Sequence, residues 1–119
     1  MRNNKNNLAY LLHIRDALNT ISSYTNKNSY KDFEKNDWDQ AAILRYLEVI
    51  GEAANKLEVS FRQQHPEIPW REVTDLRNVI IHDYMNVDTK IIWRIIMSDI
   101  PTFQGQIHAL LDELDSQVN

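Results

Sequence analysis

Four side chains suited to phosphate chemistry lie within eight residues of the chain: Arg77, Asn78, His82 and Tyr84. A histidine that titrates near neutrality can take or return a proton, and a guanidinium can hold two phosphate oxygens at once. On a helix that turns about 100° per residue, Arg77 and Tyr84 share one face, whereas Arg77 and His82 lie about 140° apart. The spacing therefore predicts either that the helix ends near His82 or that two copies of the motif meet across a dimer axis.

This set of residue types favours metal-independent cleavage of RNA. His82 would take the proton from a ribose 2′-hydroxyl or return one to the leaving oxygen, while Arg77 would stabilise the charge that builds on the phosphate. The predicted products are a 2′,3′-cyclic phosphate and a 5′-hydroxyl, and DNA should be inert because it lacks the 2′-hydroxyl. A structural interpretation uses the same residues: a surface cation at Arg77, helix-capping groups at Asn78 and His82, and a core ring at Tyr84.

Other chemistries find less support in the composition. The chain has no cysteine, so it has no disulfide, no thiolate zinc site and no thiol nucleophile, which suits a reducing cytoplasm. The four histidines are too scattered to predict a catalytic zinc, and we expect neither a metal nor a cofactor. Gly51 and Gly105 fall inside predicted helices and cannot build a phosphate-binding loop. The formal net charge of −4 argues against a broad electrostatic grip on nucleic acid, although it allows a local basic cleft.

The length and the periodicity predict a single all-α domain over residues 1–119. Two glycines and three prolines in 119 residues, with apolar residues at steps of three and four, are typical of helices. The apolar run at 8–12 is too short for a signal peptide or a membrane span, so we expect a soluble cytoplasmic protein.

Four main helices, the third of them short, are expected to form an up-and-down bundle. The first helix covers 8–21, with Asn7 on its polar face, and a polar connection with one helical turn follows at 22–36. Asp37 should cap a long second helix that continues to Phe61. A short third helix should begin at Pro69 and lead into the motif, with a loop at 83–87. The last helix, capped by Asp88 and ending near residue 114, should be kinked by Pro101.

Small residues at 51–54 in the second helix predict close helix packing. Glu52 lies among them, and it is either a solvent-facing carboxylate or a group aimed at the motif arginine.

The spacing of Arg77, His82 and Tyr84 resembles the Arg-x4-His-x-Tyr motif of the HEPN superfamily, and the chain most resembles its HepT-like branch. Supporting segments lie at 45–54, 66–72, 92–93 and 99–101, so the resemblance covers nearly the whole chain. It implies an all-helical HEPN-type homodimer in which two motifs face one cleft. It also implies a metal-independent endoribonuclease, the toxin of a toxin–antitoxin pair, that acts on RNA such as tRNA.

The resemblance also implies roles for individual residues. Arg77 would position the scissile phosphate, His82 would act as general acid or base, and Asn78, Asp83 and Glu52 would support them. Tyr84 matches the tyrosine to which the partner antitoxin MntA, a minimal nucleotidyltransferase, transfers AMP. An adenylyl group would add a negative phosphodiester and a bulky nucleoside beside the cleft, and so repel and block RNA.

Two other functions remain open from the sequence. The chain could be a non-catalytic module that docks a nucleotidyltransferase and presents Tyr84, in which case it would leave RNA intact. It could also be a structural helical dimer that does neither.

Overall fold

The computed structural model describes the backbone of residues 4–83 and 88–118, and the side chains of these residues except 4, 5, 77, 79–83, 117 and 118. Over this part of the chain every element is a helix, which confirms the all-α class. The elements are α1 (Asn4–Lys27), α2 (Tyr30–Lys35), α3 (Asp37–Lys56), α4 (Val59–Gln63), α5 (Trp70–Asp83), α6 (Thr89–Arg94), a π-helical segment η2 (Ile95–Asp99) and α7 (Ile100–Val118).

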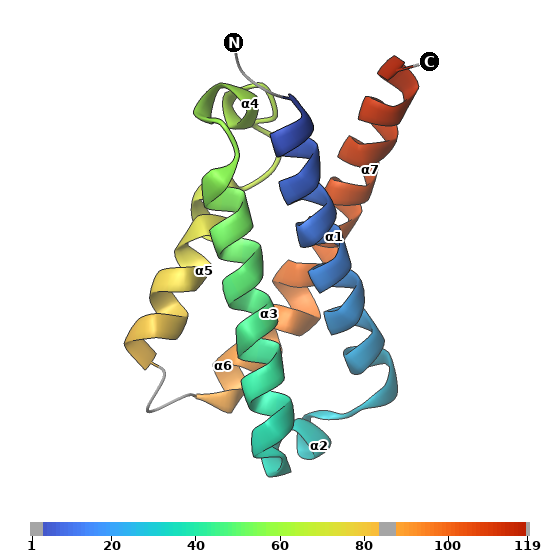
Figure 1. The fold of residues 1–119 in the computed structure, drawn as a ribbon. Helices are drawn as coiled ribbons and strands as arrows, with labels where there is room; N and C mark the ends of the chain where they lie inside the picture. Colours follow the sequence, from blue (N-terminus) through green and yellow to red (C-terminus); the bar gives the residue numbers. More distant parts are fainter. Residues whose placement is uncertain (1–3, 84–87, 119) are drawn as a thin grey trace.

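The main helices alternate in direction, as Figure 1 shows: α1 runs down, α3 up, α5 down, and the run from α6 to α7 up again. The two ends of the chain therefore lie at the same end of the bundle, and α5 ends toward the opposite end. α3 packs between α1 and α5, and α7 packs against α1. No helix in the described residues is long and apolar enough to cross a membrane.

The first helix is longer than predicted, because residues 22–27 continue it instead of forming a connection. Their polar side chains bond to their own helix: the Thr25 hydroxyl donates to the Ser22 carbonyl at 3.1 Å, and the Asn28 amide donates to the Tyr24 carbonyl at 3.0 Å. The predicted helical turn is α2, which Ser29 caps. Its anchor Phe33 is fully buried, as expected of an apolar residue in a polar segment.

The second helix begins and ends differently from its prediction. Asn36, not Asp37, is the N-cap of α3, and its side chain accepts the Asp39 backbone N–H at 3.0 Å. The helix stops at Lys56, and Phe61 belongs to the separate helix α4. At the break, Leu57 has an extended backbone, and the backbone N–H of the next residue, Glu58, donates to the Asn7 side-chain oxygen at 3.2 Å.

Asn7 itself contradicts the prediction that it lies on the polar face of the first helix. Only 3% of it is exposed, and it is the buried polar residue of the described core. Its amide nitrogen donates to Glu58 Oε1 at 2.9 Å while its oxygen accepts the Glu58 N–H. This reciprocal pair joins the start of α1 to the junction between α3 and α4.

The third helix, α5, begins at Trp70, one residue after the predicted start, because Pro69 serves as the residue before the first turn and accepts the Val73 N–H at 3.0 Å. Trp70 is buried and packs edge-on against Phe103, with ring centroids 6.2 Å apart. Its indole N–H donates to the His65 carbonyl at 3.0 Å, so the indole is satisfied at this end of the bundle.

The last helix starts as predicted, with the Asp88 side chain accepting the Lys90 and Ile91 backbone N–H groups. Pro101 is the second residue of α7, just after the π-helical segment that ends at Asp99, and the N–H of the residue between them, Ile100, bonds to the Ile95 carbonyl, five residues back. Proline has no N–H and its ring crowds the carbonyl four residues earlier. A π turn before Pro101 is therefore the local adjustment that lets the helix continue.

Candidate functional site

The motif lies at the end of α5. Arg77, Asn78, His82 and Asp83 all belong to this helix, and Asn78 is exposed. The side chains of Arg77, His82 and Asp83 and the whole of Tyr84 lie outside the described residues, so their predicted roles stay predictions. Asp83 was expected to open the loop and is instead the last residue of the helix.

The helical backbone fixes the relation between Arg77 and His82. Since α5 includes both positions and ends one residue after His82, their directions differ by about 140° and they are about 7.5 Å apart along the axis. Because residue 82 is still within the helix, the end of α5 does not change its angular position relative to residue 77.

Helix α3 packs beside the motif helix. Gly51, Ala53 and Ala54, in the segment predicted to pack closely, are buried in α3. A helix surface without long side chains lets a neighbouring backbone approach closely, which offsets the roughly 1 kcal/mol that a glycine costs inside a helix.

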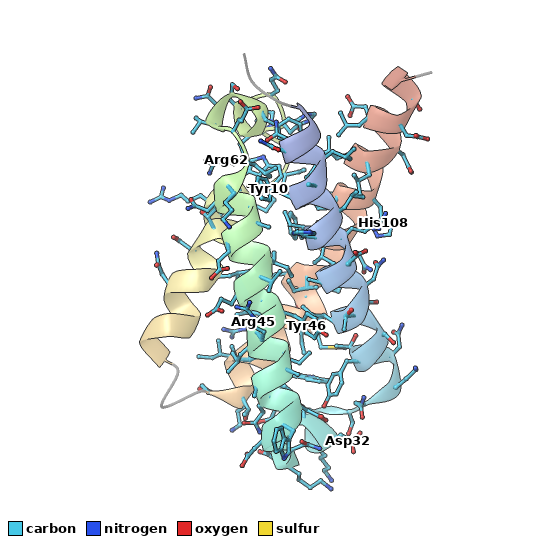
Figure 2. The ribbon with its side chains drawn as sticks, in the orientation of Figure 1. Tyr10, Asp32, Arg45, Tyr46, Arg62 and His108 are labelled. Carbon is cyan, nitrogen blue, oxygen red and sulfur yellow. The ribbon has the colours of Figure 1, made fainter. Side chains whose placement is uncertain are left out.

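Three charged residues at helical spacing follow the outer side of α3: Arg45, Glu48 and Glu52. Arg45 and Glu48 form an ion pair, and Figure 2 shows Arg45 on α3 at the level where α5 ends. Glu52 is half-buried and makes no ion pair with another described residue. Its predicted pairing with Arg77 therefore stays a prediction.

The other histidines lie away from the end of α5. His13 is exposed on α1, and His108 is exposed on α7, where its Nε2 lies 3.2 Å from the Asn19 side-chain oxygen. The His65 ring stacks on Phe61, with centroids 4.8 Å apart. Among the described side chains, no three His, Asp or Glu residues form a group that could hold a metal ion.

The shifted pKa values of the described residues belong to structural contacts, not to the motif. Burial raises the pKa of the Tyr24 hydroxyl, and its 2.7 Å hydrogen bond to Asp39 adds to the effect. The backbone N–H and the hydroxyl of Ser29 lower the pKa of Asp32, which they bond in the cap of α2. The Tyr24–Asp39 bond joins the end of α1 to the start of α3, and the Ser29–Asp32 bonds cap α2, all at the end of the bundle toward which α5 runs.

The described residues line two hollows that were not predicted from the sequence. One, of about 320 Å³, lies between the start of α5 and the η2–α7 segment, with Val73, Leu76 and Phe103 among its lining residues. The other, of about 870 Å³, lies between the start of α1, α4 and the end of α7. Such hollows depend on how distant helices diverge, which spacing along one helix does not reveal.

Proteins to which this chain is similar are named as ribonucleases. A family model described as "Ribonuclease HepT-like" matches residues 14–110, which include the whole of α5. The chain is 38% identical over 101 residues to "Probable ribonuclease HepT" of Thermococcus cleftensis, covering 85% of this chain and 92% of that protein.

Two further relatives come from Methanocaldococcus jannaschii. The chain is 33% identical over 99 residues to a "Putative RNase", covering 83% of this chain and 91% of the relative. It is 34% identical over 110 residues to a "Gamma-glutamylcyclotransferase and putative RNase", covering 92% of this chain but only 50% of that longer protein. No solved structure gives a significant match.

Proposed function

The chain belongs to the HepT-like ribonuclease family, and on that premise we propose that it is a metal-independent endoribonuclease whose site is built from Arg77 and His82. The observation that carries the proposal is the family match over residues 14–110, which spans the helix on which these two residues lie. The relatives that are named as RNases support the substrate class.

The reaction needs only groups that the motif and the substrate supply. His82, as the neutral imidazole, accepts the 2′-hydroxyl proton while the 2′-oxygen bonds to phosphorus. The bond from phosphorus to the 5′-oxygen then breaks, and that oxygen leaves with the proton that His82 accepted. Arg77 holds the phosphate oxygens as charge builds on them. The products are a 2′,3′-cyclic phosphate and a 5′-hydroxyl.

Two copies of the chain form the site in this proposal. The offset of about 140° between positions 77 and 82 on one helix works against their convergence on a single phosphate. If two copies place their α5 helices on either side of a cleft, Arg77 of one copy faces His82 of the other, and the two-fold axis creates two such pairs. The cleft would then also have a local positive charge from the two Arg77 side chains, although the net charge of the chain is negative.

Tyr84 is the proposed control point. A partner nucleotidyltransferase of the MntA type would transfer AMP from ATP to its hydroxyl and release pyrophosphate, which would make the chain the toxin of a toxin–antitoxin pair. The added phosphodiester repels the RNA backbone, and the nucleoside occupies space beside the motif.

The nuclease is tested with purified protein, labelled RNA and EDTA. Wild type should release fragments with 2′,3′-cyclic phosphate ends and should leave the matching DNA intact. His82→Ala should slow cleavage about 10²- to 10⁴-fold, and Arg77→Ala about 10²- to 10³-fold. Arg71→Ala, on the exposed face of the same helix, and His108→Ala serve as matched controls and should retain activity. Wild-type rates in both motif variants would reject the site.

Mixed subunits test the composite site. Arg77→Ala and His82→Ala proteins are each nearly inactive, but a mixed dimer contains one intact pair, formed by Arg77 of one copy and His82 of the other. Refolding the two proteins together should restore a substantial fraction of wild-type cleavage. If the mixture stays as inactive as its components while mass measurement confirms mixed dimers, each site lies within one copy.

Modification is tested by intact mass. Protein produced with its nucleotidyltransferase partner should gain the mass of AMP and lose RNA cleavage, and Tyr84→Phe produced in the same way should not gain this mass. A modified protein that still cleaves RNA at the wild-type rate would contradict the control mechanism and leave the nuclease proposal unaffected.

A further inference from the structure

The larger hollow lies at the end of the bundle away from the end of α5, where α1 and α7 diverge (Figure 1). Its volume is about 870 Å³. Leu8 and Leu12, four residues apart, face it from α1, and Leu111 and Leu114, three residues apart, face it from α7. Each wall therefore presents a short apolar row, a pair of leucines about one turn apart along its helix axis.

The apolar rows remain accessible in the described chain. Leu8 is 42% exposed, one of the large apolar residues that the bundle leaves uncovered. Leu12, Leu111 and Leu114 are half-buried. Two apolar rows on diverging helices form the kind of surface into which the apolar side of a third helix packs.

The charges on the two walls differ. Arg15 and His65 stand on the side of α1 and α4, but each already has a carboxylate beside it: Arg15 bonds Asp16 at 2.9 Å, and His65 Nδ1 lies 3.6 Å from Glu67. On the α7 wall, two of the exposed carboxylates differ in this respect. Asp112 and Glu113 make no ion pair with another residue of the described chain.

We infer that this groove, formed by α1, α4 and the end of α7, docks an amphipathic helix of a partner protein. The apolar face of that helix would fill the rows of leucines, and lysine or arginine residues on its edge would lie against Asp112 and Glu113. The groove is remote from the end of α5, so this inference does not depend on the proposed nuclease.

The experiment uses two labelled peptides of about 18 residues, roughly five helical turns. They share one face of leucines and differ only in their edges, which carry lysine in one and glutamate in the other. Binding to the full-length chain is followed by fluorescence anisotropy. The lysine-edged peptide should bind as one per chain, more tightly than the glutamate-edged one, and should weaken as salt is raised.

Charge-reversed variants test whether peptide binding depends on the carboxylates of the groove or only on the negative net charge of the chain. Asp112→Lys with Glu113→Lys should weaken the lysine-edged peptide about 2- to 30-fold, the range expected from two exposed ion pairs. The control is Glu34→Lys with Asp75→Lys, which changes the net charge equally at exposed carboxylates elsewhere. It should leave binding within about twofold of wild type. Equal effects of the two double variants would overturn the inference.

The apolar part is tested at exposed positions, where substitution should not unfold the chain. Leu8→Ser should weaken the lysine-edged peptide about 3- to 9-fold, as expected for covering the exposed part of a leucine, and Met97→Ser, 49% exposed elsewhere, should not. Unaltered binding in Leu8→Ser would overturn the inference. So would a loss of self-association in Leu8→Ser, because a second copy of the chain would then be the occupant.

Discussion

The Asn7–Glu58 pair offers the sharpest stability prediction. Asn7→Ala removes a hydrogen bond to a carboxylate at 2.9 Å and one to a backbone N–H at 3.2 Å. A hydrogen bond to a charged group contributes about 1.5–3 kcal/mol, and a neutral one about 0.5–1.5 kcal/mol. In Asn7→Ala, water from the adjoining groove can replace part of the lost hydrogen bonding. We therefore expect the free energy of unfolding to fall by about 2–3 kcal/mol.

Urea unfolding followed by circular dichroism measures this loss. For a chain of 119 residues, a loss of 1 kcal/mol lowers the melting temperature by about 4 °C, so Asn7→Ala should melt about 8–12 °C below wild type. The control is Asn6→Ala, which changes the same residue type at the exposed neighbouring position and should stay within about 0.5 kcal/mol of wild type. Equal stabilities of the two variants would refute the reasoning.

Asn7→Asp adds a pH signature to the same contact. The introduced carboxylate keeps the acceptor for the Glu58 N–H but sets a second carboxylate against Glu58 Oε1. Like charges at this distance raise the pKa of the introduced carboxyl group in the folded state. The stability deficit of Asn7→Asp should therefore be small below the unfolded pKa of about 3.9 and should grow as the pH rises through the folded pKa. A deficit independent of pH would exclude the electrostatic explanation.

Three further predictions concern the end of the bundle formed by α2 and the start of α3. Phe33→Ala should lower the free energy of unfolding by about 3–5 kcal/mol in urea, because it leaves a cavity against the rings of Tyr24 and Trp93. Asn36→Ala should cost about 1 kcal/mol in the same assay, and Asn36→Asp, which keeps an acceptor for the Asp39 N–H, should recover most of it. Because burial raises the pKa of Tyr24, wild type should lose stability as the pH rises above the unfolded value of about 10, and Tyr24→Phe should lose less.

The helical order could be predicted because its signal is local. Apolar residues at steps of three and four, a capping aspartate at Asp88 and the prolines before Trp70 each act within a few residues of their own position. The same local signals led to the wrong cap at Asp37. Asn36 and Asp37 are both good capping residues, and only the backbone geometry shows that the Asn36 side chain accepts the helix N–H.

The end of α3 could not be predicted, because the contact made at this break is with a residue far away in the sequence. The apolar spacing continues past Leu57 to Phe61, and nothing near Glu58 signals a break. The partner that takes the Glu58 N–H lies 51 residues earlier, at Asn7. Asn7 looks like a surface residue in sequence, since an asparagine can be buried only when a partner satisfies its amide.

For the candidate site, the sequence predicts the positions of residues on one helix but not which groups from other elements lie near them. The sequence places Arg77 and His82 on one helix, and the helical backbone through Asp83 retains their angular offset. This offset favours a proton-transfer group from another element for a phosphate held by Arg77. Helix α3, which packs beside α5, contains no histidine. His65 precedes the opposite end of α5, and His13 and His108 lie on exposed faces of α1 and α7. We therefore expect His82 on a facing α5 to be the source, and this is why the proposed chemistry favours the proposed pairing of two subunits.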